Sequence, residues 1–149
     1  KILNNNKKES TIEILPDVLK KFKSEYNYLF SILKEFNDSD DKSNFKLLYL
    51  MPNIARRFLE AYLYMRYPDG KNFKEKIKVF LGKSITSENK SALKIINEYS
   101  HEENPEHSLK FPDIQELNDT ISYILKEIEE KDLPHYQALC CSVGINTPK

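Results

Sequence analysis

Apolar residues recur at intervals of three and four along most of this chain, and this spacing constrains the fold more than any other feature. Only three glycines occur among 149 residues, and no clear alternation of apolar and polar residues, the pattern of a strand, extends over any length. The pattern therefore predicts an all-α fold, a single bundle of five to six helices. The clearest stripe consists of Ile114, Leu117, Ile121, Ile124, Leu125 and Ile128.

Turn-forming residues separate the expected helices. The first helix begins near Pro16, because proline suits the first helical turn, and ends near Phe36. A short helix follows at 45–51, and the next restarts at Pro52, since a proline inside a helix removes a hydrogen bond. It runs to about Arg66 and ends before a turn at 68–70. Further helices are expected at about 72–81, which ends at Gly82, and then at 87–100, 113–132 and 134–142, with a loop at 101–111 and one short edge strand at 11–14.

We also expect particular side chains to face the core. On the helix that follows Pro52, the inward positions are Ile54, Phe58, Leu59, Tyr62 and Met65. The two cysteines, Cys140 and Cys141, are adjacent and have no CxxC partner, so neither a disulfide framework nor a zinc site is expected. Both are predicted to be buried thiols in a reducing cytoplasm.

The composition fits a folded globular protein. Apolar residues make up 40% and charged residues 31% of the chain, and no run approaches the roughly 18 apolar residues of a membrane span. Residues 1–10 lack the apolar core of a signal peptide. We therefore expect a cytoplasmic protein with no membrane partner.

Charge is balanced overall but unevenly distributed. The formal net charge is zero, yet residues 71–83 hold five lysines and one acid, Glu75. A basic segment can attract a phosphate backbone, so Lys71, Lys74 and Lys78 are candidate RNA-binding residues. The alternative is an ordinary solvated helix face.

Two short motifs, forty residues apart, supply candidate catalytic groups. Arg56 and Glu60 stand four residues apart on an expected helix, so both side chains project from one face. A plain ion pair is the alternative, although the order with the acid first is the more stabilising one. His101 ends the second motif, and Asn97 could hold one of its ring nitrogens; the alternative is a histidine that interacts with the helix dipole.

The other two histidines supply no further candidate site, and neither does a nucleotide-binding motif. His107 and His135 lack an equally clear frame, and no histidine has an i,i+4 histidine partner, so no metal site is expected. No GxxxxGK[ST] loop occurs, so this chain by itself does not bind ATP in the P-loop manner.

These motifs carry a resemblance to a known family. The strings MPNIARRFLEAYL at 51–63 and IINEYSH at 95–101 resemble the C-terminal region of bacterial ABC-type ATPases of the PrrC and RloC anticodon nuclease group. The likeness covers residues 15–137, with SEYNYLF at 24–30 and DLPHY at 132–136 similar to related defence ATPases. It implies a nuclease triad of Arg56, Glu60 and His101 in a HEPN-like domain that usually dimerises. We expect Asn97 and Arg57 to support this triad. The common HEPN motif has its Arg and His close together on one helix, and this chain departs from that pattern.

The residues and the resemblance together predict a metal-independent endoribonuclease domain of an anti-phage defence ATPase, a toxin that cuts structured RNA such as a tRNA anticodon loop. The products would carry a 2′,3′-cyclic phosphate and a 5′-hydroxyl. Residues 1–14 would lead in from a missing ATPase half that binds ATP, 15–142 would form the helical nuclease-like domain, and 143–149 a tail. Two alternatives remain: a non-catalytic dimerisation or regulatory module that docks on an ABC-type ATPase or a partner nuclease, and a domain that binds RNA without cutting it.

Overall fold

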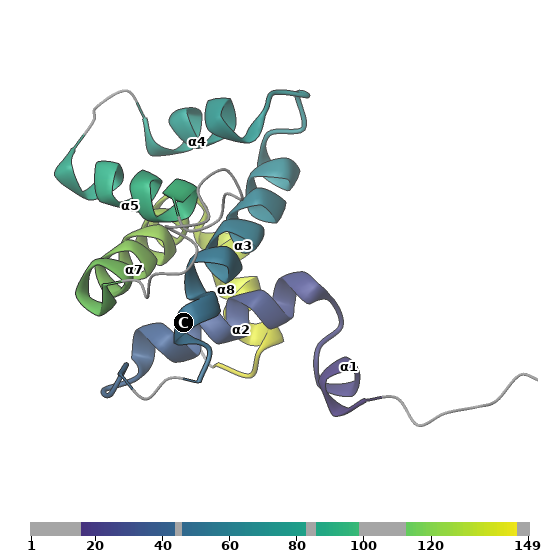
Figure 1. Cartoon of the computed structure of the whole chain (residues 1–149). Helices are drawn as coiled ribbons and strands as arrows, with labels where there is room; N and C mark the ends of the chain where they lie inside the picture. Colours follow the sequence, from purple (N-terminus) through teal and green to yellow (C-terminus); the bar gives the residue numbers. More distant parts are fainter. Residues whose placement is uncertain (1–15, 44–45, 83–85, 99–112, 146–149) are drawn as a thin grey trace, which may run out of the picture.

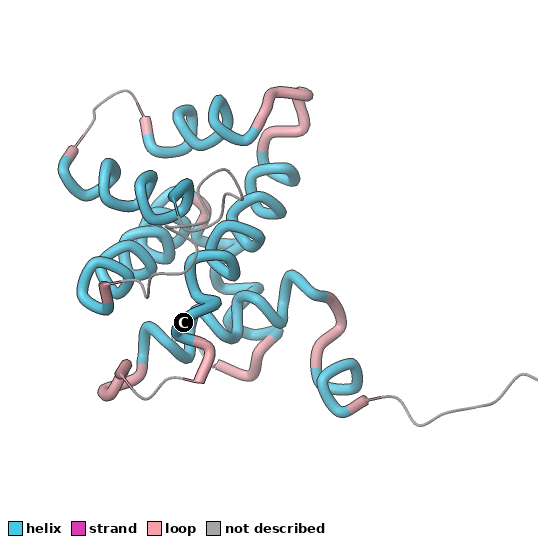
Figure 2. The backbone as a smooth tube through the Cα atoms, viewed as in Figure 1, coloured by secondary structure: helices cyan, strands magenta, loops and turns pink. Residues whose placement is uncertain are grey.

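All regular structure in the described residues is helical, which confirms the predicted all-α bundle. The computed structural model describes residues 16–43, 46–82, 86–98 and 113–145 (Figures 1 and 2). The expected strand at 11–14 and loop at 101–111 lie outside these ranges. The elements are α1 (Asp17–Lys21), α2 (Glu25–Asp38), the 3₁₀ turn η1 (Leu48–Leu50), α3 (Met51–Arg66), α4 (Phe73–Leu81), α5 (Ser87–Glu98), α7 (Ile114–Lys131) and α8 (Leu133–Ser142).

Helix α3 is the centre of the bundle. It packs against α2, α4, α5 and α7, while α5 lies alongside α7 and α4 crosses near the C-terminal end of α3 (Figure 1). Aromatic rings fill the core: Phe58 of α3 stacks on Tyr26 of α2 with ring centroids 4.9 Å apart, and Phe30 meets Tyr136 of α8 edge-on at 5.9 Å. Such pairs contribute about 0.5–1.5 kcal/mol each beyond the apolar area that they bury. No helix of the described ranges is long and apolar enough to cross a membrane.

The start of α3 confirms the predicted restart at Pro52. Proline suits the first turn of a helix because its missing N–H would have no partner there. The separate helix expected at 45–51 is wrong: residues 48–50 form only a 3₁₀ turn that leads directly into α3. Tyr49 and Leu50 in this turn are about half exposed, so the turn lacks the buried face that a longer helix needs.

The single helix expected from Pro16 to Phe36 is also wrong, because a break divides it. Ser24 adopts an extended backbone, with φ −151° and ψ 159°, and its hydroxyl oxygen accepts a hydrogen bond from the backbone N–H of Asn27. A serine in this position caps the free N–H groups at a helix start. The cap therefore begins a new helix, α2, and separates it from α1.

The remaining predicted helices are confirmed to within one or two residues where the structure describes them. Asn72 and Glu75 form a reciprocal capping box at the start of α4, and Gly82 ends that helix with φ +85°. A positive φ favours glycine, because other residues meet steric strain there. Asp113 caps α7 by accepting a hydrogen bond from the N–H of Glu116.

Some predicted burial is wrong. Met65 is 52% exposed because it lies in the last turn of α3, at the edge of the buried arc, and Ile114 is 37% exposed because it is the first residue of α7. Cys140 is buried as expected, but Cys141, its neighbour on α8, is exposed. Cys141 points about 100° away from Cys140 and so lies outside the buried side of α8, which Tyr136, Leu139 and Cys140 form.

Candidate functional site

Arg56 and Glu60 form the ion pair that their spacing on α3 predicts. The Nε of Arg56 donates a hydrogen bond of 2.8 Å to Oε1 of Glu60. The Arg56 side chain is 17% exposed and that of Glu60 is 43% exposed. The arginine is thus held mostly inside the surface, while the carboxylate remains accessible to solvent.

Arg56 also reaches the two helices that follow α3. Its Nη1 donates a long hydrogen bond of 3.5 Å to the carbonyl oxygen of Ile96, near the end of α5, and its guanidinium carbon lies 4.9 Å from the ring centre of Phe73 on α4. Carbonyls in the last turn of a helix carry partial negative charge and favour a cation. Three helices therefore fix the position of this guanidinium.

The third member of the predicted triad is not described. His101 lies outside the described residues, and Asn97 belongs to α5 but its side chain is not described. The structure thus brings Arg56, which also binds Glu60, to the C-terminal end of α5, and His101 follows Ile96 by five residues in the sequence. The convergence of the full triad stays a prediction.

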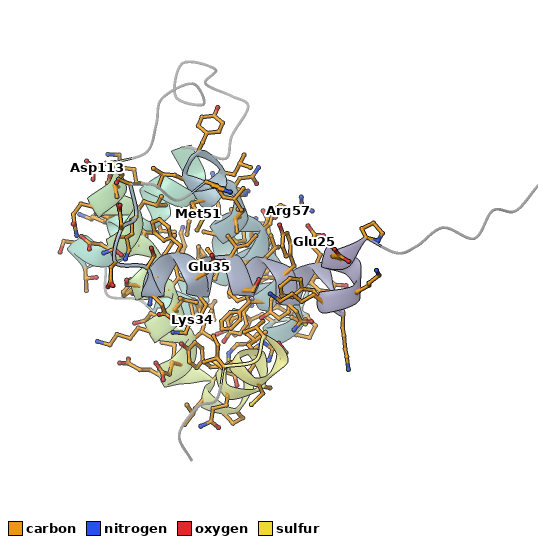
Figure 3. All side chains as sticks on the ribbon, turned by 90° about the horizontal axis from the view of Figure 1, so that it is seen from below. Glu25, Lys34, Glu35, Met51, Arg57 and Asp113 are labelled. Atoms are coloured by element: carbon orange, nitrogen blue, oxygen red, sulfur yellow. The ribbon has the colours of Figure 1, made fainter. Side chains whose placement is uncertain are left out.

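Arg57 lies on the side of α3 that faces α2. It forms an ion pair with Glu25 at the start of α2, and both side chains are 58% exposed. The two labelled side chains lie next to each other in Figure 3. Arg57 therefore belongs to the junction of α2 and α3, and Arg56 to the junction of α3, α4 and α5.

The three candidate RNA-binding lysines differ in their surroundings. Lys74 and Lys78 are exposed on α4, four residues apart and thus on one face. Lys71 precedes the helix and pairs with Asp69 at 2.7 Å, and this hydrogen bond lowers the pKa of the Asp69 carboxyl and raises the pKa of Lys71. Lys76, which the sequence did not single out, is buried, and its Nζ lies 5.2 Å from the ring centre of Tyr64.

A polar cluster that the motifs did not predict joins α2, α3 and α8. The hydroxyl of Tyr26 and Nε2 of His135 are 2.8 Å apart, and the His135 ring also lies 5.5 Å from that of Tyr62. The pKa of Tyr62 is raised to about 12, chiefly by burial; the charge of Arg66 opposes this shift, and the charge of Asp132 adds to it. Burial likewise raises the pKa of Tyr26, so this hydroxyl stays protonated and can donate to a neutral imidazole. The only feature of the sequence that pointed to this cluster was the DLPHY string at 132–136, which contains His135.

Beside Glu60, the surface forms a shallow hollow between α2 and α3, which we term the α2–α3 groove. Its volume is about 440 Å³. No group of three or more potential metal ligands occurs within the described part of the chain. The groove is lined by Glu25, Tyr26, Leu29, Arg57, Glu60, Ala61, Tyr64 and Met65.

Comparison with known proteins shows one family. A family model described as AAA domain matches residues 1–128, which is most of the chain. No curated protein and no solved structure shows a significant match.

Proposed function

Because the chain belongs to the AAA-domain family, we propose that it supplies such an ATPase with a metal-independent endoribonuclease domain that cleaves structured RNA. A tRNA anticodon loop is the proposed target, and anti-phage defence the proposed setting. The resemblance of the motifs around Arg56 and His101 to anticodon nucleases motivates this choice of substrate.

One observation carries the proposal: the Arg56 guanidinium is bound to Glu60 and also to the end of α5, the helix that precedes His101 in the chain. A pair that served α3 alone would not need a partner forty residues away. Because Ile96 belongs to the second motif, this contact supports a shared active site, in which the two motifs would have to meet.

The chemistry divides among the three residues. RNA cleavage by internal transfer needs a base for the 2′-hydroxyl proton, an acid for the leaving 5′-oxygen, and positive charge beside the phosphorane. Histidine is the side chain whose unperturbed pKa lies closest to neutrality, so His101 would move one proton. Arg56 would stabilise the phosphorane, because its planar guanidinium matches phosphate oxygens.

Glu60 would act in two ways. Its carboxylate binds Nε of Arg56 and so orients the guanidinium, and its 43% exposure leaves it accessible as the second proton carrier. Asn97 is proposed to orient His101, and the exposed Lys74 and Lys78 to attract the RNA backbone. ATP would be bound by the ATPase part of the protein, in cis or in trans, and a homodimer is the proposed assembly.

The test is cleavage of total tRNA by the purified chain in EDTA. We expect 2′,3′-cyclic phosphate ends with the unchanged chain and almost none with Arg56→Ala or His101→Ala. Lys126→Ala removes a cation that is 71% exposed on α7, so it serves as the control and should cleave normally. Equal cleavage by the two site variants, or cleavage only after a divalent metal is added, would contradict the proposal.

A non-catalytic module is the second candidate, and exposed apolar side chains favour it. Tyr64, Met65 and Val79 are each more than half exposed, and large apolar side chains on a surface often mark contacts with other proteins. In that case, the chain would form a dimer or bind an ATPase core. Arg56→Ala would then change neither this association nor the amount of RNA that is cleaved. Light scattering with and without RNA separates this candidate from an RNA-binding domain that does not cut.

A further inference from the structure

We propose that two copies of this chain pair through one face, in which α4 of each copy lies over the α2–α3 groove of the other. We term it the pairing face, and it consists of the groove, Tyr64 and the exposed residues of α4. This pairing rests on the homodimer in the proposed function and adds the surface that would form it.

The α2–α3 groove is mostly apolar and carries more acids than bases. Its apolar part is formed by Tyr26, Leu29, Ala61, Tyr64 and Met65. The charged residues that line it are Glu25 and Glu60, against Arg57. Charges across an interface are arranged to be complementary, so an occupant of this groove should carry an apolar side chain together with net positive charge.

Helix α4 has this combination on its exposed side. Lys74 and Lys78 are exposed, and neither makes an ion pair within the described residues. Val79, next to Lys78, is 53% exposed. Glu75, the acid of this helix, accepts a hydrogen bond from the backbone N–H of Asn72 in the capping box. The exposed side of α4 is therefore basic and includes one uncovered valine.

Tyr64 lies at the boundary between the groove and α4. It lines the groove, and Nζ of Lys76 in α4 lies 5.2 Å from its ring centre. Val79 follows Lys76 by three residues, so both project from the same side of α4. Since α4 lies beside the C-terminal end of α3 (Figure 1), the acidic groove and the basic helix are neighbours, and the ring between them is 70% exposed.

This arrangement is complementary to a second copy of itself. A two-fold rotation about an axis through Tyr64 places α4 of the second copy over the groove of the first, and the reverse. Both contacts then join unlike charges, and the two tyrosine rings meet near the axis. Most homodimers have this symmetry and use the same patch on both copies, and tyrosine is enriched at the centre of interfaces. A second copy is thus the partner that the charges of this face fit.

The pairing would also complete the proposed active site. Glu60 precedes Tyr64 by four residues, which is about 6 Å along the helix axis. The exposed lysines of α4, Lys74 and Lys78, would therefore lie beside Glu60 of the other copy. The lysines that we propose to attract RNA would then do so at the site of the partner, so that a monomer would lack them there.

The first experiment measures association without RNA. Sedimentation of the full chain over a dilution series gives the dissociation constant of the dimer. Tyr64→Ala should raise this constant at least about 10-fold, because tyrosines at the centre of an interface carry much of the binding energy. Tyr49→Ala is the matched control and should leave it unchanged, since Tyr49 is 48% exposed but lies in η1, before the opposite end of α3.

The second experiment reverses the charges. The double variant Lys74→Glu/Lys78→Glu makes α4 acidic, and Glu25→Lys makes the groove basic. Each variant alone should dimerise more weakly, because like charges then meet. An equimolar mixture should regain the dimer, because each α4 then meets a groove of opposite charge. All of these side chains are exposed, so circular dichroism should show unchanged helix content.

Three results would overturn this pairing. The unchanged chain could stay monomeric from about 1 μM to 1 mM, Tyr64→Ala could associate as tightly as Tyr49→Ala, or the mixture of the charge variants could fail to dimerise. The nuclease can fail separately. A dimer that follows these rules, together with no tRNA cleavage by any variant, would support the pairing and refute the nuclease, whereas Arg56-dependent cleavage by a monomeric chain would do the reverse.

Discussion

Replacing Arg56 with alanine should separate a structural role from a catalytic one by the size of two effects. The structural loss can be summed from the contacts. The i,i+4 pair with Glu60 contributes about 0.2–0.5 kcal/mol, the contact with Phe73 about 0.5–1 kcal/mol, and the long hydrogen bond to Ile96 about 0.5 kcal/mol. Together, Arg56→Ala should lower the free energy of unfolding by about 1–2 kcal/mol.

A loss of this size has little effect on the folded population. For a chain of this length, it corresponds to a decrease in Tm of about 2–8 °C. A typical domain has an unfolding free energy of about 5–15 kcal/mol, so nearly all of the variant stays folded at 25 °C. Destabilisation alone would therefore leave cleavage almost unchanged.

Catalysis would respond far more strongly. Loss of one preorganised donor beside a developing negative charge lowers kcat by about 10²–10³-fold. We expect Arg56→Ala to lose at least about 100-fold in single-turnover cleavage of tRNA, and Arg56→Lys to lie between, because lysine keeps the charge but not the planar fork. Thermal unfolding followed by circular dichroism gives Tm, and gel analysis of single-turnover reactions gives the rate.

Two results would refute this reasoning about Arg56. A decrease in Tm well beyond 8 °C would show that the contacts of Arg56 hold the bundle together more than we infer. A rate within about 3-fold of the unchanged chain, with the expected decrease in Tm, would leave Arg56 as a purely structural residue. Lys126→Ala should change neither quantity, because that lysine is 71% exposed and outside the site.

Three further predictions concern stability. Tyr26→Phe removes the hydrogen bond to His135 and should lower the free energy of unfolding in urea by about 1 kcal/mol. Tyr62→Phe should lower it by less than about 0.5 kcal/mol or raise it, because the buried Tyr62 hydroxyl makes no hydrogen bond of normal geometry within the described residues. Gly82→Ala should cost about 1–2 kcal/mol in the same assay, since φ is +85° there although nothing lies within 4 Å of an added Cβ. Because the folded-state pKa of Tyr62 is raised to about 12 from 10, its contribution is fully present below pH 10 and is lost as the pH rises toward 12; Tyr62→Phe should therefore flatten the alkaline decline in stability, while Tyr49→Phe should not.

Local chemistry made several helix ends predictable from the sequence. Pro52 and Gly82 act through their own backbone limits, so the start of α3 and the end of α4 needed no knowledge of the rest of the fold. Ser24 carries an equally local signal, but the apolar spacing on either side of it continues in register. The hydrophobic pattern therefore favoured one helix, and the cap divided it into α1 and α2.

Exposure at the helix ends was harder to predict, because it depends on what the neighbouring helices cover. Met65 has the correct spacing for a core residue, yet it lies where the buried arc of α3 ends. No role for His135 was predicted from the sequence, yet the structure places it in contact with Tyr26. Its interaction with Tyr26 joins residues that are 109 positions apart, and no local motif marks such a contact.

The candidate site combines both kinds of information. The Arg56–Glu60 pair follows from helix geometry alone, because residues four apart always lie on one face. The contacts of Arg56 with Ile96 and Phe73 depend on how α5 and α4 pack, and they are the reason that an arginine in the less favourable order is nevertheless only 17% exposed. Tertiary structure, rather than the helix preference, therefore fixes this guanidinium, and a cation fixed in advance loses less entropy when it meets a phosphate.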